Sequence, residues 1–145
     1  MIKYPLHFRV EASSPSGIST PLEGKGEDFP SIHCAIPKEF NGPGGGYSPE
    51  ELFALAGVTC IMATFKVFAE RGKLSYASIA GEAKLTIDRN EEGVAALQKL
   101  EMTFTFSGVA DEEKAKVLLA ESQKYCLVCN AIKCVKSFTT QFIPA

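Results

Sequence analysis

This chain of 145 residues has no excess of positive charge. Lys and Arg number 15 against 17 Asp and Glu, which gives a formal net charge of −2 at pH 7, and the isoelectric point is about 5.7. No cluster of basic residues occurs anywhere in the sequence. A protein that binds nucleic acid needs a concentrated positive field to contact the phosphates, so we expect no nucleic-acid partner.

The sequence shows no long apolar run, and its first residues do not resemble a signal peptide. The longest mostly apolar stretch, Leu52 to Phe65, is shorter than the roughly 20 residues that a membrane-spanning helix needs. The first twelve residues, MIKYPLHFRVEA, show no apolar signal region and no small-residue cleavage site. We therefore expect a cytoplasmic (cytosolic) protein with no membrane partner. There is no internal repeat, and the length predicts a single domain over residues 1–145.

Alternation of apolar and polar residues predicts several strands. Leu6, Phe8 and Val10 alternate with polar residues and predict a half-buried strand. Further strands are expected within 29–36, over 79–88, over 100–107 and over 136–142, with the main turn signals at 90–93. A helix with an acidic start is expected over 111–125, and a short helical turn over 127–132. This irregular order predicts an α+β domain with antiparallel strand pairing.

The strongest helix signal lies in the middle of the chain. Ser48 is a good N-cap, Pro49 suits the first helical position, and Glu51 completes a capping box. The helix is expected to run to about Arg71, with Gly72 as its stop. Its middle is apolar on nearly every face, and such a helix must be buried all round. We infer that a sheet covers one side and that a partner subunit covers the other.

The five cysteines are an odd number, which favours reactive or buried thiols over structural disulfides in a reducing compartment. Cys60 lies mid-helix in an apolar run, where it is either a small core residue or a reactive thiol. Cys126 precedes the short helical turn, and the helix dipole there is expected to lower its pKa. Cys129, three residues on, completes a C-x-x-C pair, which is either a redox pair or half of a metal site.

The cysteines and histidines also raise two alternatives, a zinc site and a Cys–His nucleophile. Cys134, together with Cys126 and Cys129, supplies three candidate zinc ligands, with His33 or Cys34 as a fourth, but this spacing matches no usual zinc knuckle. We expect no metal and no other cofactor. His33 and Cys34 are adjacent, and adjacent residues of a strand point to opposite faces, so they are not expected to form a Cys–His nucleophile.

Two further motifs are more specific in combination. The first runs from the loop Gly42 to Gly46, which must bend sharply or pass close to another group, through Ser48-Pro49-Glu50-Glu51 to Cys60, ten residues after Glu50. The second follows a helix and reads Cys126-Leu127-Val128-Cys129-Asn130. Both resemble the OsmC/Ohr family of thiol-dependent hydroperoxide reductases, and the resemblance covers nearly the whole chain. It implies an OsmC-like fold, with antiparallel sheets packed around a long buried central helix in an intertwined homodimer.

The resemblance also implies a mechanism. Cys60 would be the peroxidatic thiolate, which attacks an alkyl or fatty-acid hydroperoxide and becomes a sulfenic acid. Cys126 would be the resolving thiol, which closes a disulfide and releases water, and a dithiol reductant of dihydrolipoyl type would restore both thiols. The apolar surroundings of Cys60 suit organic hydroperoxides better than hydrogen peroxide.

The sequence departs from the family at two positions. Family members carry an Arg in the loop after the first strand, which pairs with the Glu and activates the thiol. The matching stretch, Ser13-Ser14-Pro15-Ser16-Gly17, holds no Arg, and Arg9 or Lys25 is a candidate substitute cation. Cys129 stands where the family usually has Ser, as an additional thiol that either resolves Cys126 in turn or is simply buried.

The helix rise separates two of the candidate site residues. Ten residues of helix place Glu50 roughly 15 Å from Cys60 along the axis, so Glu50 cannot touch Cys60 of its own chain. If the two act together, Glu50 comes from a second subunit, which predicts a two-fold dimer with sites at the interface. Three other functions stay open: a small-molecule-binding protein, a redox-sensing or metal-binding protein, and a structural module.

Overall fold

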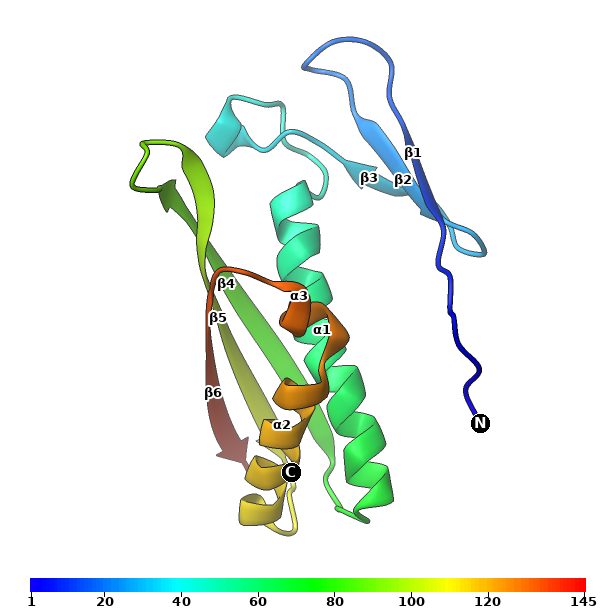
Figure 1. The fold of residues 1–145 in the computed structure, drawn as a ribbon, viewed down its shortest axis with the longest axis vertical. Coiled ribbons are helices and arrows are strands. Elements are labelled where there is room, and N and C mark those ends of the chain that lie inside the picture. The colour runs from blue at the N-terminus through cyan, green and yellow to red at the C-terminus, as the bar shows by residue number, and fades with distance from the viewer. The chain divides into compact units, whose positions relative to one another are not determined.

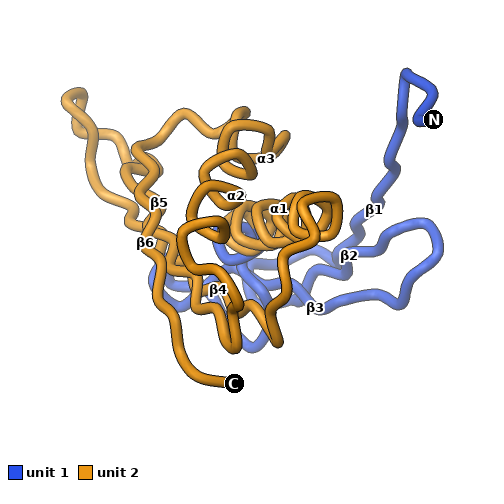
Figure 2. Tube along the Cα trace, turned by 90° about the horizontal axis from the view of Figure 1, so that it is seen from below, with its two compact units in different colours: residues 1–52 blue, residues 53–145 orange.

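The computed structural model describes residues 1–145, and the chain divides into two compact units, residues 1–52 and 53–145 (Figure 2). The fold is α+β with two three-stranded sheets and a central helix (Figure 1). This agrees with the predicted fold class. The single-domain organisation stays a prediction.

Unit 1 contains a three-stranded antiparallel sheet in the order β1-β2-β3. Its strands are β1 (Val10–Ser13), β2 (Leu22–Gly26) and β3 (Ile32–Cys34), and a 3-10 helix follows at Lys38–Phe40. The prediction of a half-buried strand around Leu6 to Val10 is wrong, because β1 begins only at Val10 and the side chain of Phe8 is 91% exposed. Alternation indicates an apolar face, but it does not say whether the same chain covers that face. The sequence pattern did not reveal β2.

The glycine-rich loop of unit 1 passes close to backbone, as predicted. A Cβ added at Gly42 would lie 2.1 Å from the carbonyl oxygen of Ile36, and one at Gly46 would lie 2.9 Å from that of His33. Real Cβ atoms do not approach so closely, so neither position accepts a side chain without a backbone shift. Gly44 has a φ of +64°, a conformation that side chains other than glycine rarely adopt. The loop therefore depends on its glycines.

The central helix α1 spans Pro49–Arg71, as the capping residues predict. The Oγ of Ser48 accepts the backbone N–H of Glu51 at 3.1 Å. At the other end the N–H of Gly72 bonds to the carbonyl of Phe68 at 2.8 Å. The helix ends at Arg71, directly before Gly72, as predicted, and the left-handed residue that then turns the chain away is Lys73, with a φ of +54°.

By length and composition alone, α1 is long and apolar enough to cross a membrane. This corrects the sequence estimate, which counted only the shorter apolar run within it. The core helix of a soluble protein has the same properties. Residues spaced along α1, including Val58, Ile61, Phe65 and Ala69, are buried in the hydrophobic core, so we interpret it as a core helix.

The sheet of unit 2 has the order β4-β5-β6. The strands β4 (Ser78–Arg89) and β5 (Ala95–Ser107) form an antiparallel hairpin, and the Oδ1 of Asn90 accepts the N–H groups of Glu92 and Val94 in its turn, each at 3.0 Å. In contrast, β6 (Val135–Ile143) runs parallel to β5, so the prediction of wholly antiparallel pairing is wrong. The connection from β5 to β6 passes through two helices, and a helical crossover of this length is what parallel neighbours require.

Those two helices are α2 (Glu112–Tyr125) and α3 (Leu127–Ala131). The helices α1 and α2 lie on the same face of the β4-β5-β6 sheet (Figures 1 and 2). The core side chains of β5 are those predicted from its alternation, namely Leu100, Met102, Phe104 and Phe106. Burial of each such side chain contributes about 1.5–3 kcal/mol, and this shared core fixes α1 and α3 relative to the sheet.

Candidate active site

Cys60 lies in the middle of α1 and is half-buried. It packs against the hydrophobic core of unit 2, so one side of the residue faces the interior and part of it stays accessible. Cys60 is therefore less buried than the two other thiols of this region, Cys126 and Cys129. Its role as the peroxidatic residue stays a prediction.

Cys126 and Cys129 lie at the junction of α2 and α3 and are 0% and 1% exposed. Cys126 is both the C-cap of α2 and the N-cap of α3, and its Sγ accepts the backbone N–H of Cys129 at 3.4 Å. The first turn of α3 thus brings the backbone of Cys129 next to the sulfur of Cys126. The Cys60 side chain lies beside Cys126 and contributes to the rise in its pKa. Three thiols from two distant parts of the chain therefore share one site.

Gly57 connects α1 to this cluster. Its carbonyl oxygen accepts the Cys129 thiol, with the sulfur 3.7 Å away, and it lies one helical turn before Cys60. A Cβ at this position would lie 3.2 Å from the Cδ2 of Leu100 and 3.7 Å from the Cδ1 of Ile132. The lack of a side chain on Gly57 is what allows α3 and β5 to approach α1 this closely.

Burial controls the ionisation of the two inner thiols. It raises the pKa of Cys126 to about 12, with a further rise from Cys60 and a smaller opposing effect of the Cys129 N–H. Burial also raises the pKa of Cys129. The expectation that a helix terminus lowers the pKa of Cys126 is therefore wrong, because removing a thiolate from water outweighs the single N–H that faces it.

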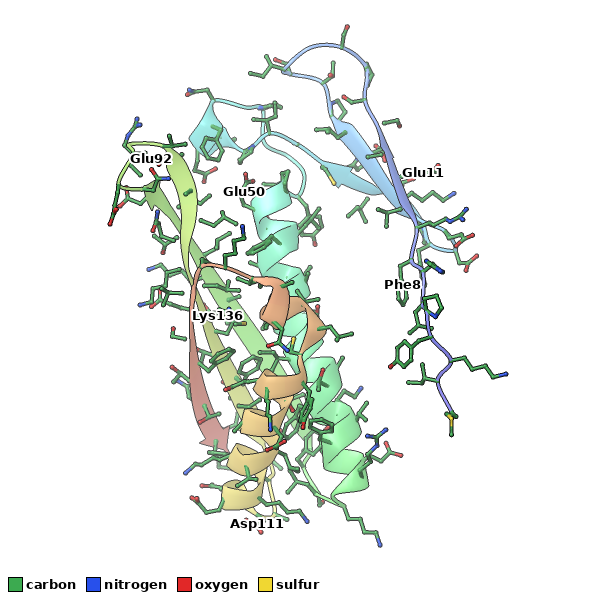
Figure 3. The ribbon with its side chains drawn as sticks, in the orientation of Figure 1. Phe8, Glu11, Glu50, Glu92, Asp111 and Lys136 are labelled. Carbon is green, nitrogen blue, oxygen red and sulfur yellow. The ribbon has the colours of Figure 1, made fainter.

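One cation belongs to the site. Lys136, near the start of β6 (Figure 3), donates from its Nζ to the carbonyl oxygen of Ile132 at 2.7 Å, the residue that caps the end of α3. Its charge lowers the pKa of Cys129 and opposes part of the effect of burial. Lys136 is the first residue of the strand expected over 136–142, and nothing in the sequence pattern assigns it a role beside the thiols.

The predicted acidic residue, Glu50, lies in the first turn of α1 and belongs to unit 1. Its Oε2 is buried and has no hydrogen-bond partner in the chain. A buried carboxylate oxygen without a partner is costly, so its surroundings lack a donor. Arg9 lies just before β1 in unit 1, is exposed and makes no ion pair. Its role as a substitute cation stays a prediction.

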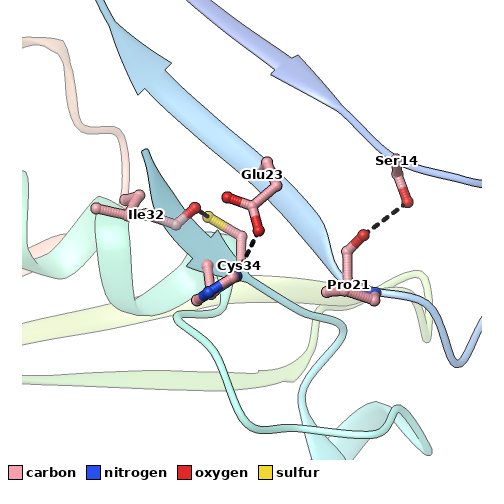
Figure 4. A network of polar contacts seen from close by, with 6 residues as sticks. Ser14, Pro21, Glu23, Ile32 and Cys34 are labelled. Atoms are coloured by element: carbon pink, nitrogen blue, oxygen red, sulfur yellow. Dashed lines mark hydrogen bonds and ion pairs between the residues drawn. The ribbon is translucent and has the colours of Figure 1, made fainter. Parts of the chain in front are cut away.

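The remaining cysteines lie in other surroundings. Cys34 ends β3 in unit 1, with its Sγ 4.0 Å from the carbonyl oxygen of Ile32 (Figure 4). The neighbouring His33 pairs with Glu23 across β2 and β3. Cys134, just before β6, lines a cavity of about 340 Å³ in unit 2 with Phe53 and Ile132. No group of three or more His, Cys, Asp or Glu side chains is arranged to hold a metal ion.

Comparison with known proteins decides the family. The family model described as OsmC-like protein matches residues 42–141. The chain belongs to the OsmC-like protein family. The match includes all three thiols of the cluster, Lys136 and the glycine-rich loop. Arg9 lies outside it.

Relatives of known structure share the OsmC-like fold at low sequence identity. An OsmC-like protein of unknown function from Vibrio cholerae has a TM-score of 0.79 and 15% identity, covering 96% of this chain and 100% of that one. An organic hydroperoxide resistance protein OsmC from Legionella pneumophila has a TM-score of 0.74 and 20% identity, covering 95% and 98%. An uncharacterised protein of Acinetobacter baylyi is 28% identical over 105 residues, 70% of each chain. At these identities the two structures show the fold alone.

Proposed function

We propose that this OsmC-like protein is a thiol-dependent peroxidase that reduces organic hydroperoxides. The observation that carries the proposal is the meeting of Cys60 and Cys126, which are 66 residues apart in the sequence, against one hydrophobic core. A peroxidase of this type needs one thiol for the oxidant and a second thiol within reach. The names of some structural neighbours, such as the Legionella pneumophila protein, support the same class of substrate.

Exposure separates the roles of the two cysteines. Cys60 is half-buried, whereas Cys126 is fully buried. A hydroperoxide therefore meets Cys60 first, which makes Cys60 the peroxidatic thiol and Cys126 the resolving thiol. The apolar residues around Cys60 favour a hydroperoxide with an organic substituent, because each buried methylene contributes about 0.8 kcal/mol to its binding.

The reaction proceeds in two steps. The Cys60 thiolate attacks the terminal peroxide oxygen, so that the O–O bond breaks, a sulfenic acid forms and an alkoxide leaves, which becomes the alcohol by taking up the proton that the Cys60 thiol lost. The Cys126 sulfur then attacks the Cys60 sulfur, and the sulfenic hydroxyl leaves as water with the Cys126 proton. The high pKa of Cys126, about 12, keeps this thiol protonated at neutral pH. The second step is therefore slowed at neutral pH in the absence of a base.

A second copy of the chain is part of this proposal. On α1 the apolar side chains of Leu55 and Val67 are 45% and 47% exposed, although the sequence is apolar on nearly every face. Glu50 also has a buried oxygen without a partner. A homodimer in which α1 packs against its copy would cover the apolar surface, and it would bring Glu50 of one subunit near Cys60 of the other.

The mixed-dimer experiment tests this arrangement. Glu50→Gln and Cys60→Ser chains are inactive separately in a shared site, but a mixed dimer contains one site with both native residues. Recovery of activity on mixing is expected. A chain that sediments with a mass of 15.6 kDa at micromolar concentration, or no recovery from a confirmed mixed dimer, contradicts the shared site.

Turnover itself is tested with cumene hydroperoxide as substrate and dihydrolipoamide as the dithiol reductant. We expect Cys60→Ser to lose all activity and Cys126→Ser to lose steady turnover, while Cys34→Ser, in the other unit, serves as the matched control with unchanged activity. Hydrogen peroxide is expected to be the poorer substrate. Retention of activity in Cys60→Ser excludes the proposal. The five free thiols suit a reducing compartment, so we place the enzyme in the cytosol.

One observation favours a second candidate function, the binding of a small apolar molecule without catalysis. Unit 1 contains an apolar cavity of about 590 Å³, lined by side chains that include Phe29, Ile32 and Cys34. That volume is within the range of small-molecule sites. Stoichiometric cumene hydroperoxide separates the two functions, because a binding protein leaves Cys60 reduced. Calorimetric titration with a medium-chain fatty acid then tests the cavity.

A further inference from the structure

We propose that Cys129 is a second resolving thiol, so that the oxidised chain ends with a Cys126–Cys129 disulfide and a free Cys60. This inference rests on the proposed peroxidase. In the two-cysteine mechanism the cycle stops at the Cys60–Cys126 disulfide. In the mechanism that we propose, Cys129 then attacks this disulfide at the Cys126 sulfur.

The geometry of α3 carries the inference. The backbone nitrogen of Cys129 is 3.4 Å from the Sγ of Cys126, and residues three apart in a helical turn have Cβ atoms about 5–6 Å apart. A disulfide needs Cβ atoms about 3.5–4.5 Å apart, so a small closing of the turn joins the two sulfurs. Both residues are fully buried, and both belong to the same five-residue helix and its cap.

The contacts of Cys129 in this structure suit a thiol that attacks only after the Cys60–Cys126 disulfide has formed. Its thiol donates to the carbonyl of Gly57, with the sulfur 3.7 Å away, and Gly57 lies one turn from Cys60 on α1. Both Cys60 and Cys129 lie beside Cys126 and interact with its thiol. The nearby Lys136 ammonium stabilises a thiolate at Cys129 when it forms. Cys126 is thus positioned to exchange one disulfide partner for another.

The exchange conserves atoms and electrons. The Cys129 sulfur attacks the Cys126 sulfur, the Cys126–Cys129 bond forms and the Cys60–Cys126 bond breaks. The electron pair of the broken bond returns to Cys60, which takes up the proton that Cys129 loses. No oxidant or reductant enters this step, and the oxidising equivalent that the hydroperoxide supplied moves from the accessible thiol to the buried pair.

A measurable consequence follows for the stoichiometry. Without reductant, the two-cysteine mechanism consumes one equivalent of hydroperoxide per chain, because Cys60 ends in a disulfide. With the exchange, Cys60 is regenerated and reacts a second time, so the chain consumes two equivalents. Reduction follows the reverse path, since Cys60 re-forms the bond to Cys126 and presents its accessible sulfur to the dithiol.

The test combines stoichiometry with disulfide mapping. Wild type, Cys129→Ser and the matched control Cys134→Ser receive excess cumene hydroperoxide without reductant, and the burst is measured. Separate samples receive one equivalent, are quenched in acid, alkylated with N-ethylmaleimide and mapped by peptide mass spectrometry. A parallel series uses diamide, which forms disulfides without peroxidase chemistry. Circular dichroism confirms that each variant is folded, and Cys129→Ala is the substitute if the serine variant is not.

We expect bursts of two equivalents for wild type and Cys134→Ser and of one for Cys129→Ser. The expected final disulfide is Cys126–Cys129 in wild type and Cys60–Cys126 in Cys129→Ser, with either oxidant. A wild-type chain that retains Cys60–Cys126 after diamide overturns the inference, whatever its peroxidase activity. Loss of the peroxide burst with normal diamide products overturns the proposed function and leaves the exchange supported.

Discussion

The ionisation of Cys126 makes the resolving step strongly dependent on pH. The thiolate is the attacking species, and a pKa of about 12 leaves a thiolate fraction of about 10⁻⁵ at pH 7 and about 10⁻³ at pH 9 by the ordinary ionisation equilibrium. The rate of disulfide formation is therefore expected to rise about a hundredfold between these pH values, without a plateau. A solvent-exposed cysteine, with a pKa of about 8.5, would give a smaller rise that levels off by pH 9.

The assay follows one turnover. Protein is mixed with one equivalent of cumene hydroperoxide at pH 7, the pH is raised in a second mix, and acid-quenched samples are alkylated and weighed by mass spectrometry. Cys129→Ala is the informative variant, because it removes the Cys129 side chain, which raises the pKa of Cys126, and keeps the N–H that lowers it. Its resolving step is expected to be faster than that of wild type at pH 8. A wild-type profile that levels off near pH 8.5 refutes the reasoning.

Four further outcomes are expected. Because the pKa of folded Cys126 is raised, its contribution to stability is fully present below the unfolded pKa near 8.5 and is lost as pH rises toward 12. Urea titrations should therefore show wild type losing up to about 5 kcal/mol of unfolding free energy relative to Cys126→Ser over that window. The same dependence of unfolding free energy on pH in both proteins would contradict the burial of this thiol. Lys136→Met should slow formation of the Cys126–Cys129 disulfide in the diamide series, because loss of the ammonium charge raises the pKa of Cys129. An unchanged rate excludes a role for the ammonium. Phe104→Ala, at a fully buried site, should cost about 3–5 kcal/mol in urea unfolding, and a loss below 1 kcal/mol would mean that this core is not formed. Ser48→Ala should cost about 1 kcal/mol through the lost N-cap, which thermal melts can detect, whereas no shift would mean that the cap contributes nothing.

The sequence predicts most of the local structure because the signals are local. The ends of α1 follow from Ser48, Pro49 and the glycine after Arg71, and the β4–β5 hairpin follows from its alternation and from Asn90. The parallel pairing of β6 was missed because strand direction depends on the path of α2 and α3, which no periodicity records. The predicted strand near Phe8 begins before the observed β1. The alternation there marks apolar side chains, but this chain leaves them exposed.

At the candidate site, too, local sequence patterns are informative and the effects of long-range packing are not predictable from them. The resemblance of two motifs to the OsmC/Ohr family points to Cys60 and Cys126 as site residues. The direction predicted for the pKa of Cys126 is wrong, because burial is a property of the assembled core. The role of Lys136 depends on the end of α3 coming to β6, and the role of Gly57 depends on a contact with a residue 72 positions away. Long-range packing decides both, so neither is available from the sequence.

The site of oxidation tests the central claim most directly. A chain carrying Cys126→Ser and Cys129→Ser retains Cys60 and has no partner thiol in the cluster to consume a sulfenic acid. It is treated with one equivalent of cumene hydroperoxide in the presence of dimedone, which labels sulfenic acids, and digested for peptide mass spectrometry. We predict a single labelled residue, Cys60. Labelling of Cys34 or Cys134 instead, or an unlabelled chain with its hydroperoxide unconsumed, would contradict the account.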